Sequence, residues 1–502
     1  MAGSAMSVSP EFSDIQGIVR FGHRRLTAAC FFLLRIVDAA AARRWLAQAP
    51  VTDAVQRDAP PDTALQVALT AEGLRALGTP EGIVAGFSAE FIAGMAGDGN
   101  RSQRLGDVGG NAPAQWGWGR PGAVPHVLVM VYATPARFAA WRDEVTSGMW
   151  ARAFALIGCL DTSDLGGREP FGFADGISQP TLDWERSGAF DNVQLDYRNL
   201  AALGEFLLGY PNEYARYTDR PLIDPAADPS GLLPAAEDMP GRRDLGRNGT
   251  YLVLRDLSQD VGGFWQFLDR QGGETGLAAQ ALAEAMVGRT MDGAPLVPLS
   301  RGPVAGIGAE DHGPPNRFTF ADDPDGARCP FGAHIRRVNP RNADMPGGPG
   351  GAISRLIRTA GFGRQGWRDD LVAPARFHRI LRRGRPYGAK LTPEEAQHAG
   401  AGEERGIRFI CLNANISRQF EFVQNAWVMG TKFNGLTAES DPLLGNRQPV
   451  SGCPATDSFT YSRDGAVRRR LRGIPQFVTV RGGAYFFLPG IRALRYLAAM
   501  NG

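Results

Sequence analysis

Residues 329–341 read Cys-Pro-Phe-Gly-Ala-His-Ile-Arg-Arg-Val-Asn-Pro-Arg, so one histidine, His334, stands among small and apolar residues with three arginines behind it. A neutral imidazole is a good axial ligand for haem iron, and arginines can bind the two carboxylates that a haem carries. The alternative interpretation is a core histidine followed by a solvated basic turn. Taken alone, the stretch favours that alternative, so the choice depends on the rest of the chain.

Length and composition describe an ordinary globular protein. The chain has 502 residues, of which 43% are hydrophobic and 21% are charged. This length predicts two domains or two half-domains, because a single hydrophobic core rarely grows so large. The 54 lysines and arginines against 52 acidic residues leave a formal charge of +2. Such a balance argues against a general nucleic-acid binder and against an acidic coat.

The cysteines are few and scattered, and none stand in C-x-x-C spacing: Cys30, Cys159, Cys329, Cys411 and Cys453. An odd, sparse set predicts neither a disulfide framework nor a zinc site, and it fits a reducing compartment. Residues 1–12 are small and polar, without the basic and apolar regions of a signal peptide and without a twin-arginine segment. No apolar run is long enough to span a membrane. We therefore expect a cytoplasmic protein.

The first part of the chain alternates strand and helix patterns. Strands are predicted at residues 26–37, 65–69 and 126–132, and helices at residues 38–48, 70–78 and 134–145. Phe87, Phe91 and Met95 are spaced four apart, which predicts one apolar helix face. This order predicts a ferredoxin-like half, in which helices cover one face of an antiparallel sheet.

The second part repeats that plan after a long loop region. Residues 181–249 are rich in loop-forming residues, and we place the boundary there: an N-terminal half at 12–220, a connecting loop at 221–244 and a C-terminal half at 245–500. Strands are predicted at residues 251–255, 407–412, 477–480 and 484–487, and helices at residues 261–270, 276–287, 416–429 and 491–500. Thr392 and Glu395 form a capping box that begins a further short helix.

Two further stretches carry unusual chemistry. Asp175 lies in Phe171–Pro180 (Phe-Gly-Phe-Ala-Asp-Gly-Ile-Ser-Gln-Pro). Its Asp-Gly pair is a common turn, but a carboxylate among aromatic residues is costly unless it has a partner or a role. Residues 375–390 hold five arginines and one lysine without an acidic residue. They could form a nucleic-acid or membrane patch, but no second basic face accompanies them.

These stretches, taken in order, resemble the longer subgroup of the dye-decolorizing peroxidases. The resemblance covers most of the chain from Asp14 to Ala498. It depends on motifs in the family's order: Asp14-Ile15-Gln16-Gly17, the G-x-x-D-G signature Gly172–Gly176, the proximal-histidine motif around His334, the distal-arginine segment Ile380–Gly388, the strand Arg405–Phe409 and the C-terminal strand Arg481–Pro489. G-x-x-D-G alone would be weak evidence, but the downstream motifs make the resemblance specific.

The resemblance implies an α+β fold with two ferredoxin-like halves in one chain, each an antiparallel sheet with peripheral helices, in the family's dimeric α+β barrel. It also implies one haem b per chain, held in the C-terminal half. His334 is then the proximal iron ligand through Nε2, and Asp441 is the carboxylate that accepts from its other ring nitrogen.

On the opposite haem face the resemblance implies that Asp175 and Arg382 serve one reaction. The carboxylate moves the proton of peroxide, and the guanidinium, which stays charged, stabilises the leaving oxygen. Ile407 and Phe409 wall this pocket, and alternation turns Arg408 away from it. Arg336, Arg337 and Arg341 are candidates for the haem propionates. Arg385 stands where the family would have an aliphatic residue, which leaves the polarity of the access channel open.

The implied function is a peroxidase that reduces hydrogen peroxide and oxidises dyes, phenols or other bulky aromatic reductants through a ferryl intermediate. Because such reductants cannot reach a buried haem, Tyr387 with Trp427 behind it is the candidate electron relay, although packing alone also explains both. The alternative is a haem-handling protein, either a carrier or a deferrochelatase. We expect no nucleic-acid or membrane partner, and either a monomer or a dimer.

Overall fold

The computed structural model describes residues 10–186, 199–299, 316–320, 322–341, 374–398, 403–462 and 467–500. The N-terminal half contributes four strands to the main sheet: β1 (Ala28–Ile36), β2 (Thr63–Leu69), β3 (Val127–Ala133) and β4 (Phe154–Asp161). Every residue of β3 is buried, because both faces of the sheet are covered. The predicted strand positions are therefore confirmed, and their continuous apolar runs follow from burial on both faces.

The C-terminal half contributes the remaining strands: β9 (Thr250–Gln259), β10 (Leu381–Arg382), β11 (Arg385–Tyr387), β12 (Gly406–Asn413) and β15 (Val478–Leu488). Within the described residues these strands and the first four form one nine-stranded sheet, in the order β10-β12-β9-β15-β2-β3-β1-β4, with β11 also pairing β12. All its pairings that the register gives are antiparallel.

The two halves repeat one topology. In each half the first and third strands are central, and the second and fourth flank them: β2-β3-β1-β4 in one, and β10/β11-β12-β9-β15 in the other. This is the ferredoxin-like order, so the prediction of an α+β fold with two such halves is confirmed. The sheet of the described residues is open, not a closed barrel. Its edges approach where the N–H of Ser163 donates to the carbonyl of Pro386 at 2.8 Å, just after β4 ends.

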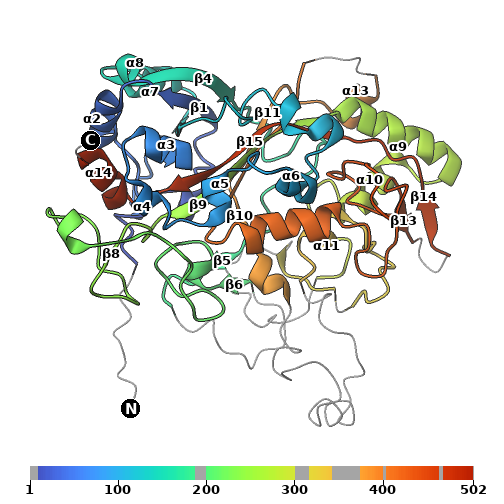
Figure 1. The fold of residues 1–502 in the computed structure, drawn as a ribbon. Helices are drawn as coiled ribbons and strands as arrows, with labels where there is room; N and C mark the ends of the chain where they lie inside the picture. The colour runs from blue at the N-terminus through green and yellow to red at the C-terminus, as the bar shows by residue number, and fades with distance from the viewer. Residues whose placement is uncertain are drawn as a thin grey trace, which may run out of the picture.

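Helices cover this sheet at both ends (Figure 1). The N-terminal half contains α1 (Ile18–Phe21), α2 (Ala39–Gln48), α3 (Ala71–Ala76), α4 (Glu81–Val84), α5 (Ala89–Ala93), α6 (Gly99–Leu105), α7 (Phe138–Val145) and α8 (Trp150–Ala153). The C-terminal half contains α9 (Val261–Thr275), α10 (Ala279–Val287), α11 (His334–Val338), α13 (Pro393–His398), the π-helical η8 (Ser417–Glu421) and η9 (Val423–Met429), and α14 (Ile491–Ala499). No helix in the described part of the chain has the length and apolar character needed to cross a membrane.

Short strands lie outside the main sheet and form two-stranded pairs. These are β5 (Thr181–Leu182) with β6 (Leu200–Ala201), β7 (Leu222–Ile223) with β8 (Arg243–Asp244), and β13 (Phe459–Tyr461) with β14 (Arg469–Leu471). The first two pairs lie in the region predicted to be mostly loop, and they organise it without extending the main sheet.

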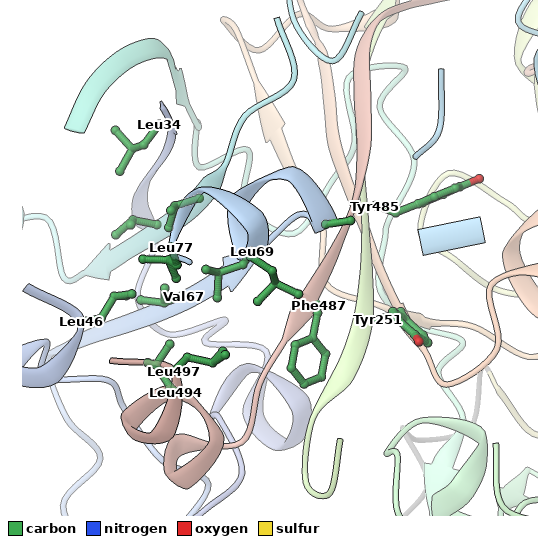
Figure 2. Close-up of a cluster of buried hydrophobic side chains, with 14 of the residues drawn as sticks. Leu34, Leu46, Val67, Leu69, Leu77, Tyr251, Tyr485, Phe487, Leu494 and Leu497 are labelled. Atoms are coloured by element: carbon green, nitrogen blue, oxygen red, sulfur yellow. The ribbon is translucent and has the colours of Figure 1, made fainter. Parts of the chain in front are cut away.

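The largest core lies on one face of the sheet and joins the two halves. Figure 2 shows Leu69 of β2 next to Phe487 of β15, with Val67 of β2 and with Leu494 and Leu497 of α14 in the same cluster. Each of these five side chains is buried, and full burial of such a side chain stabilises by about 1.5–3 kcal/mol. The last helix of the chain therefore completes the core of the first half. Alternate residues of the same strands form a second core on the opposite face.

The opening motif Asp14-Ile15-Gln16-Gly17 ties the chain start to both halves. The amide of Gln16 bonds to both backbone groups of Val67 in β2, at 2.8 and 2.9 Å, and to the carbonyl of Pro489 after β15, at 2.9 Å. The carboxylate of Asp14 accepts from the N–H of Arg492 at 2.7 Å, in the first turn of α14. Because both side chains are buried, losing either would leave unpaired polar groups in the core.

The C-terminal strand differs from its prediction. Two strands were expected around Arg481-Gly482-Gly483, but β15 is continuous, with a bulge between Val480 and Gly482. The reason is a close approach by the Trp118 loop, because a Cβ on Gly482 would lie 2.4 Å from Trp118 Nε1. A residue with a side chain would not fit at position 482 unless Trp118 moved. In the sequence, the glycine pair predicts a break between two strands, because glycine is uncommon inside strands.

Two helix predictions also need correction. The helix that holds Phe91 covers only Ala89–Ala93, so Phe87 and Met95 lie outside it, although all three side chains are buried in one core. The helix predicted at 416–429 is present but is wound as two π-helical segments. Apolar periodicity does not separate these windings, because both bury a similar face.

The prediction that the cysteines form no disulfide is wrong. Cys30 of β1 and Cys159 of β4 form a disulfide, while Cys329, Cys411 and Cys453 are free and buried. The two strands are hydrogen-bonded neighbours, with Phe32 opposite Cys159, so β-pairing brings together residues 129 apart in sequence. Disulfides are rare in reducing compartments, so the cysteines no longer support a cytoplasmic location.

The disulfide ties an edge strand to the sheet, so breaking it lowers stability. We expect Cys159→Ser to lower the free energy of unfolding by about 2–4 kcal/mol. Reductant should lower the melting temperature of the parent protein and leave that of the variant unchanged. Titration of the unreduced, denatured chain should find three free thiols. Five reactive thiols, or a reductant effect in the variant, would contradict the assignment.

Candidate active site

A cavity of ≈ 290 Å³ lies over the C-terminal end of β9. The register of β9 with β12 and β15 determines which residues form the floor of this cavity. Ile407 and Val480 both lie opposite Leu257, and Phe409 lies opposite Arg255. These side chains share one face of the sheet, because alternate residues of a strand point to the same side. Segments around Asp175, His334 and Trp427 form the other walls. The cavity is therefore apolar over the sheet and carries its polar groups on separate loops.

His334 begins α11 and lines this cavity. Its Nδ1 lies 2.9 Å from Oδ2 of Asp441, which is fully buried. A carboxylate only accepts, so Nδ1 carries the hydrogen of the neutral ring and Nε2 has the free lone pair. Nε2 has no hydrogen-bond partner among the described residues. The ring therefore presents a ligand nitrogen.

Asp441 is held as a carboxylate. Burial alone raises its pKa, but His334, Arg337 and the N–H of Leu444 outweigh that effect and hold the pKa at about 2. Its other oxygen, Oδ1, accepts from the N–H groups of Leu443 and Leu444, each at 2.9 Å. Three donors thus fix the carboxylate that orients His334.

Asp175 and Arg382 face each other on another wall. Arg382 donates from NH1 to Oδ1 of Asp175 at 3.3 Å and from NH2 to the carbonyl of Ser178 at 3.2 Å. Its backbone N–H donates to the side chain of Gln179 at 3.0 Å. Strand β10 and the loop 175–179 are therefore tied together. Both charged groups line the cavity, with 44% of the Asp175 side chain and 35% of the Arg382 side chain exposed.

Ile407 and Phe409 lie on the cavity floor, and Arg408 between them points away. Arg408 forms an ion pair with Asp256 on the opposite face and lies 3.5 Å from the ring centre of Tyr387. Burial raises the pKa of Tyr387 to about 12, with the charge of Asp256 adding to the effect. Tyr387 does not line the cavity, whereas Trp427 does.

The three arginines of the opening stretch have different surroundings. Arg336 binds Asp323 at 2.9 Å, and Arg337 donates to the carbonyls of Trp427, Gly430 and Glu439. Both are buried and neither lines the cavity, which differs from the expectation that they face a haem. Arg341 lines the cavity and donates to the Asn316 side chain at 2.7 Å.

Arg289 was missed by the sequence analysis. It lines the cavity beside Arg341 and Arg382, and all three arginines donate to Ser178. Burial, together with the charges of Arg341 and Arg382, lowers the pKa of Arg289 to about 9. Three cations so close together favour an anionic ligand. No sequence signal marked Arg289, because it stands alone after α10.

Glu169 was also missed. It lines the cavity, and its carboxylate accepts from the N–H groups of Phe171 and Phe173 and from the amide of Gln259, each at 3.0 Å. Burial raises its pKa to about 7 despite these donors, and the charge of Asp175 adds to the rise. In the sequence, only its position two residues before Phe171, next to the stretch that holds Asp175, could have indicated that Glu169 belongs to the site.

The basic segment 375–390 does not form a solvated face. Arg376 pairs with Glu213, Arg379 donates to the carbonyl of Asn199 at 3.0 Å, and Arg383 donates to those of Ile18 and Val19, each at 2.7 Å. Arg385 donates to the carbonyl of His23, away from the cavity. These contacts use the guanidinium groups inside the protein.

The donor set fits an iron porphyrin. His334 offers one imidazole nitrogen, and the floor and walls offer apolar contact to a flat ring. Arg289 and Arg341, which both donate to the Ser178 hydroxyl, suit two carboxylates. Elsewhere in the described chain, the one cluster of potential metal ligands consists of the disulfide cysteines with Asp161. Cysteines in a disulfide have no thiolate to give a metal.

Known proteins with similar sequences are named as dye peroxidases. No family model matches the chain. A dye-decolorizing peroxidase of Mycetinis scorodonius is 30% identical, over 98% of this chain and 89% of that protein. One of Auricularia auricula-judae is 28% identical, over 98% and 88%. A multifunctional dye peroxidase of Amycolatopsis is 29% identical, over 86% and 82%.

Solved structures agree as well. A crystal structure of the Auricularia auricula-judae peroxidase has a TM-score of 0.71 at 25% identity and covers 98% of this chain and all of that chain. A structure described as a dye-decolorizing peroxidase with an engineered heme pocket has a TM-score of 0.70 at 25% identity, covering 98% of this chain and all of that one. An Anabaena peroxidase shares the fold, with a TM-score of 0.70 at 22% identity over 97% and 94%. The chain belongs to the dye-decolorizing peroxidase family.

Proposed function

We propose that this chain is a haem-dependent peroxidase that reduces hydrogen peroxide and oxidises dyes, phenols and other bulky aromatic reductants, with one haem b per chain. The observation that carries the proposal is one cavity bounded both by the His334 ring and by the Asp175–Arg382 pair. The names of the relatives, and the heme pocket of one solved neighbour, support it.

On one side of the cavity, His334 would hold the haem iron through Nε2. Asp441 accepts the Nδ1 hydrogen, which makes the imidazole a stronger donor and fixes its orientation. A bound haem would supply the two electrons that cleavage of the O–O bond requires and would retain the oxygen that does not leave as water. Arg341 and Arg289 would bind the propionates, and Ser178 aligns both guanidinium groups.

On the other side, Asp175 takes a proton from one oxygen of the peroxide and returns it to the outer oxygen, which leaves as water. Arg382 remains charged and stabilises the negative charge that develops on the outer oxygen. Ile407 and Phe409 keep the surroundings apolar, so this charge is little screened. A haem carrier needs His334 but gains nothing from such a pair, which disfavours that alternative.

Glu169 positions Asp175. Its carboxylate binds the N–H groups of Phe171 and Phe173 and links that turn to Gln259 at the end of β9. Asp175 follows Phe173 by two residues, so the turn that Glu169 holds also fixes the position of the Asp175 backbone.

The division into residues 12–220, 221–244 and 245–500 also remains a proposal. The repeated strand order supports it.

The decisive experiment is an optical spectrum of the haem-loaded chain before and after peroxide. We expect the Soret band to shift within seconds, and Asp175→Asn or Arg382→Leu to slow that shift about 10²–10⁴-fold. Asp256→Asn is the matched control, because it alters an acid–guanidinium pair on the opposite face of β9. A chain that binds no hemin, or variants that react at the parent rate, would contradict the proposal.

The pH dependence of the peroxide step tests the proton carrier. A carboxylate is a weaker base than the imidazole that serves other haem peroxidases, so we expect the highest rate on the acidic side of neutrality. The measurement is the peroxide reaction rate at constant ionic strength across that range. An optimum above neutrality would argue against Asp175.

The relay hypothesis predicts that Tyr387→Phe loses most turnover of a bulky dye but keeps turnover of a small phenol. Tyr387 is only 7% exposed and packs against Arg408, on the side of the sheet away from the cavity. It is therefore a candidate for carrying an electron between the surface and the cavity floor. Tyr461→Phe is the matched control, because that tyrosine is also buried and also does not line the cavity. Full dye turnover in Tyr387→Phe would refute the relay.

Glu169 gives a stability prediction. Its pKa rises from 4.5 to about 7 on folding, because burial disfavours the charge. The folded chain then binds an extra proton between these values, and stability falls as pH rises through them. The quantity to follow is the unfolding free energy of the parent protein minus that of the Glu169→Gln variant. We expect this difference to fall by about 1–3 kcal/mol as the pH rises from the lower to the higher pKa value.

Chemical denaturation at several pH values gives this difference. Glu81→Gln is the control with the opposite trend, because the hydrogen bond from Arg75 lowers the pKa of that exposed carboxyl. A difference that stays constant with pH would contradict the assignment of a titrating Glu169.

A further inference from the structure

A second acid–guanidinium pair lines the same cavity. Arg255 of β9 forms an ion pair with Asp107, and the two residues are only 3% and 2% exposed. Arg255, Leu257 and Gln259 occupy alternate positions of β9, so they share the face that forms the cavity floor. The pair is thus built into the wall and is not a surface contact.

This wall holds three buried polar atoms without a hydrogen-bond partner in the described part of the chain: Oδ2 of Asp107, Nε of Arg255 and Oε1 of Gln259. The three residues are at most 8% exposed. Buried polar atoms are nearly always hydrogen-bonded, and a polar cavity with room for a small molecule supplies the missing partner. The adjoining cavity of ≈ 290 Å³ has that room.

The charges identify the kind of guest. The carboxylate of Asp107 and the guanidinium of Arg255 already neutralise each other, so neither an anion nor a cation gains from binding there. At this pair the open positions are one acceptor, Oδ2 of Asp107, and one donor, Nε of Arg255. A small neutral molecule with an O–H group donates to the acceptor and accepts from Nε, and both water and hydrogen peroxide have this chemistry.

The wall leads towards the proposed catalytic pair. From Gln259, Nε2 donates to Oε2 of Glu169 at 3.0 Å, and Oε1 of Glu169 accepts from the N–H of Phe173 at 3.0 Å. Asp175 follows two residues later and lines the same cavity. Gln259, four residues further along β9 than Arg255, therefore carries its unpartnered Oε1 next to the hydrogen bonds that lead to the turn before Asp175.

We propose that Asp107 and Arg255 form a binding subsite for a small neutral hydrogen-bonding molecule. The subsite holds a water molecule that hydrogen peroxide can displace, and the peroxide then passes along the Gln259 side of the wall to Asp175. The role in peroxide delivery rests on the proposed function. Binding at the subsite itself rests on the two unpartnered atoms of this ion pair, Oδ2 of Asp107 and Nε of Arg255.

Kinetics of the haem-loaded chain test the delivery role. Asp107→Asn and Arg255→Lys each remove one hydrogen bond to the bound molecule. Such a bond contributes about 0.5–1.5 kcal/mol, so each variant should slow the reaction with peroxide about two- to tenfold. Arg255→Lys keeps the charge next to Asp107, so it remains informative if Asp107→Asn fails to fold. Asp256→Asn, from the pair on the opposite face, should react at the parent rate. Unchanged rates in both wall variants would overturn delivery.

Crystal structures of haem-loaded Asp175→Asn, before and after a peroxide soak, test the occupant. Two bonded oxygens bridging Asp107 and Arg255 after the soak identify peroxide, and a single oxygen in both structures identifies water. No density at these atoms would overturn the subsite. Failure of the proposed function looks different: the Asp175 variant would then react with peroxide at the parent rate, whatever occupies the wall.

Discussion

The backbone ladder on both sides of β9 is the constraint on which the rest of this structure depends. Every residue from Tyr251 to Ser258 has a partner in β12, and the ladder with β15 runs along the same strand. A slip of either neighbour by one residue would exchange the side chains that face the two cores. Tyr251 and Val253 lie in the main core, and Arg255, Leu257 and Gln259 continue the same face as the cavity floor. One strand face therefore passes from core to site, and core packing fixes the geometry of the floor.

Buried charge decides which arginines face the cavity. A guanidinium inside a protein needs hydrogen-bond acceptors or a counter-charge, because otherwise the loss of its solvation is not offset. Arg336 binds Asp323, Arg337 donates to three backbone carbonyls, and Arg408 forms an ion pair with Asp256. Arg289, Arg341 and Arg382 instead converge on Ser178. The cavity therefore concentrates positive charge at one corner, while arginines close by in sequence serve only the fold.

Local patterns predicted the strands and the two-half plan, because each leaves a short-range signal, whereas the roles of His334, Asp175 and Arg382 followed from the family resemblance and not from a local pattern. The apolar run of β1 and the alternation of Ile407, Arg408 and Phe409 are examples. What the sequence did not reveal depends on long-range pairing. The Cys30–Cys159 disulfide needs β1 beside β4, and the bulge in β15 needs Trp118 against Gly482. Glu169 and Arg289 belong to the cavity only because separate loops meet there, and no spacing along the chain encodes that meeting.

Two carboxylates show how the same number of hydrogen bonds can give opposite electrostatics. Asp441 accepts from His334 and from two backbone N–H groups, and Glu169 accepts from two backbone N–H groups and an amide. Burial raises both pKa values, but His334 and the guanidinium of Arg337 hold the pKa of Asp441 at about 2, whereas the negative Asp175 helps to raise the pKa of Glu169 to about 7. Glu169 has no cation among the groups that shift its pKa, and neutral donors do not replace a counter-charge. The carboxylate behind His334 is therefore charged at neutral pH, and the one behind Asp175 changes its charge near neutrality.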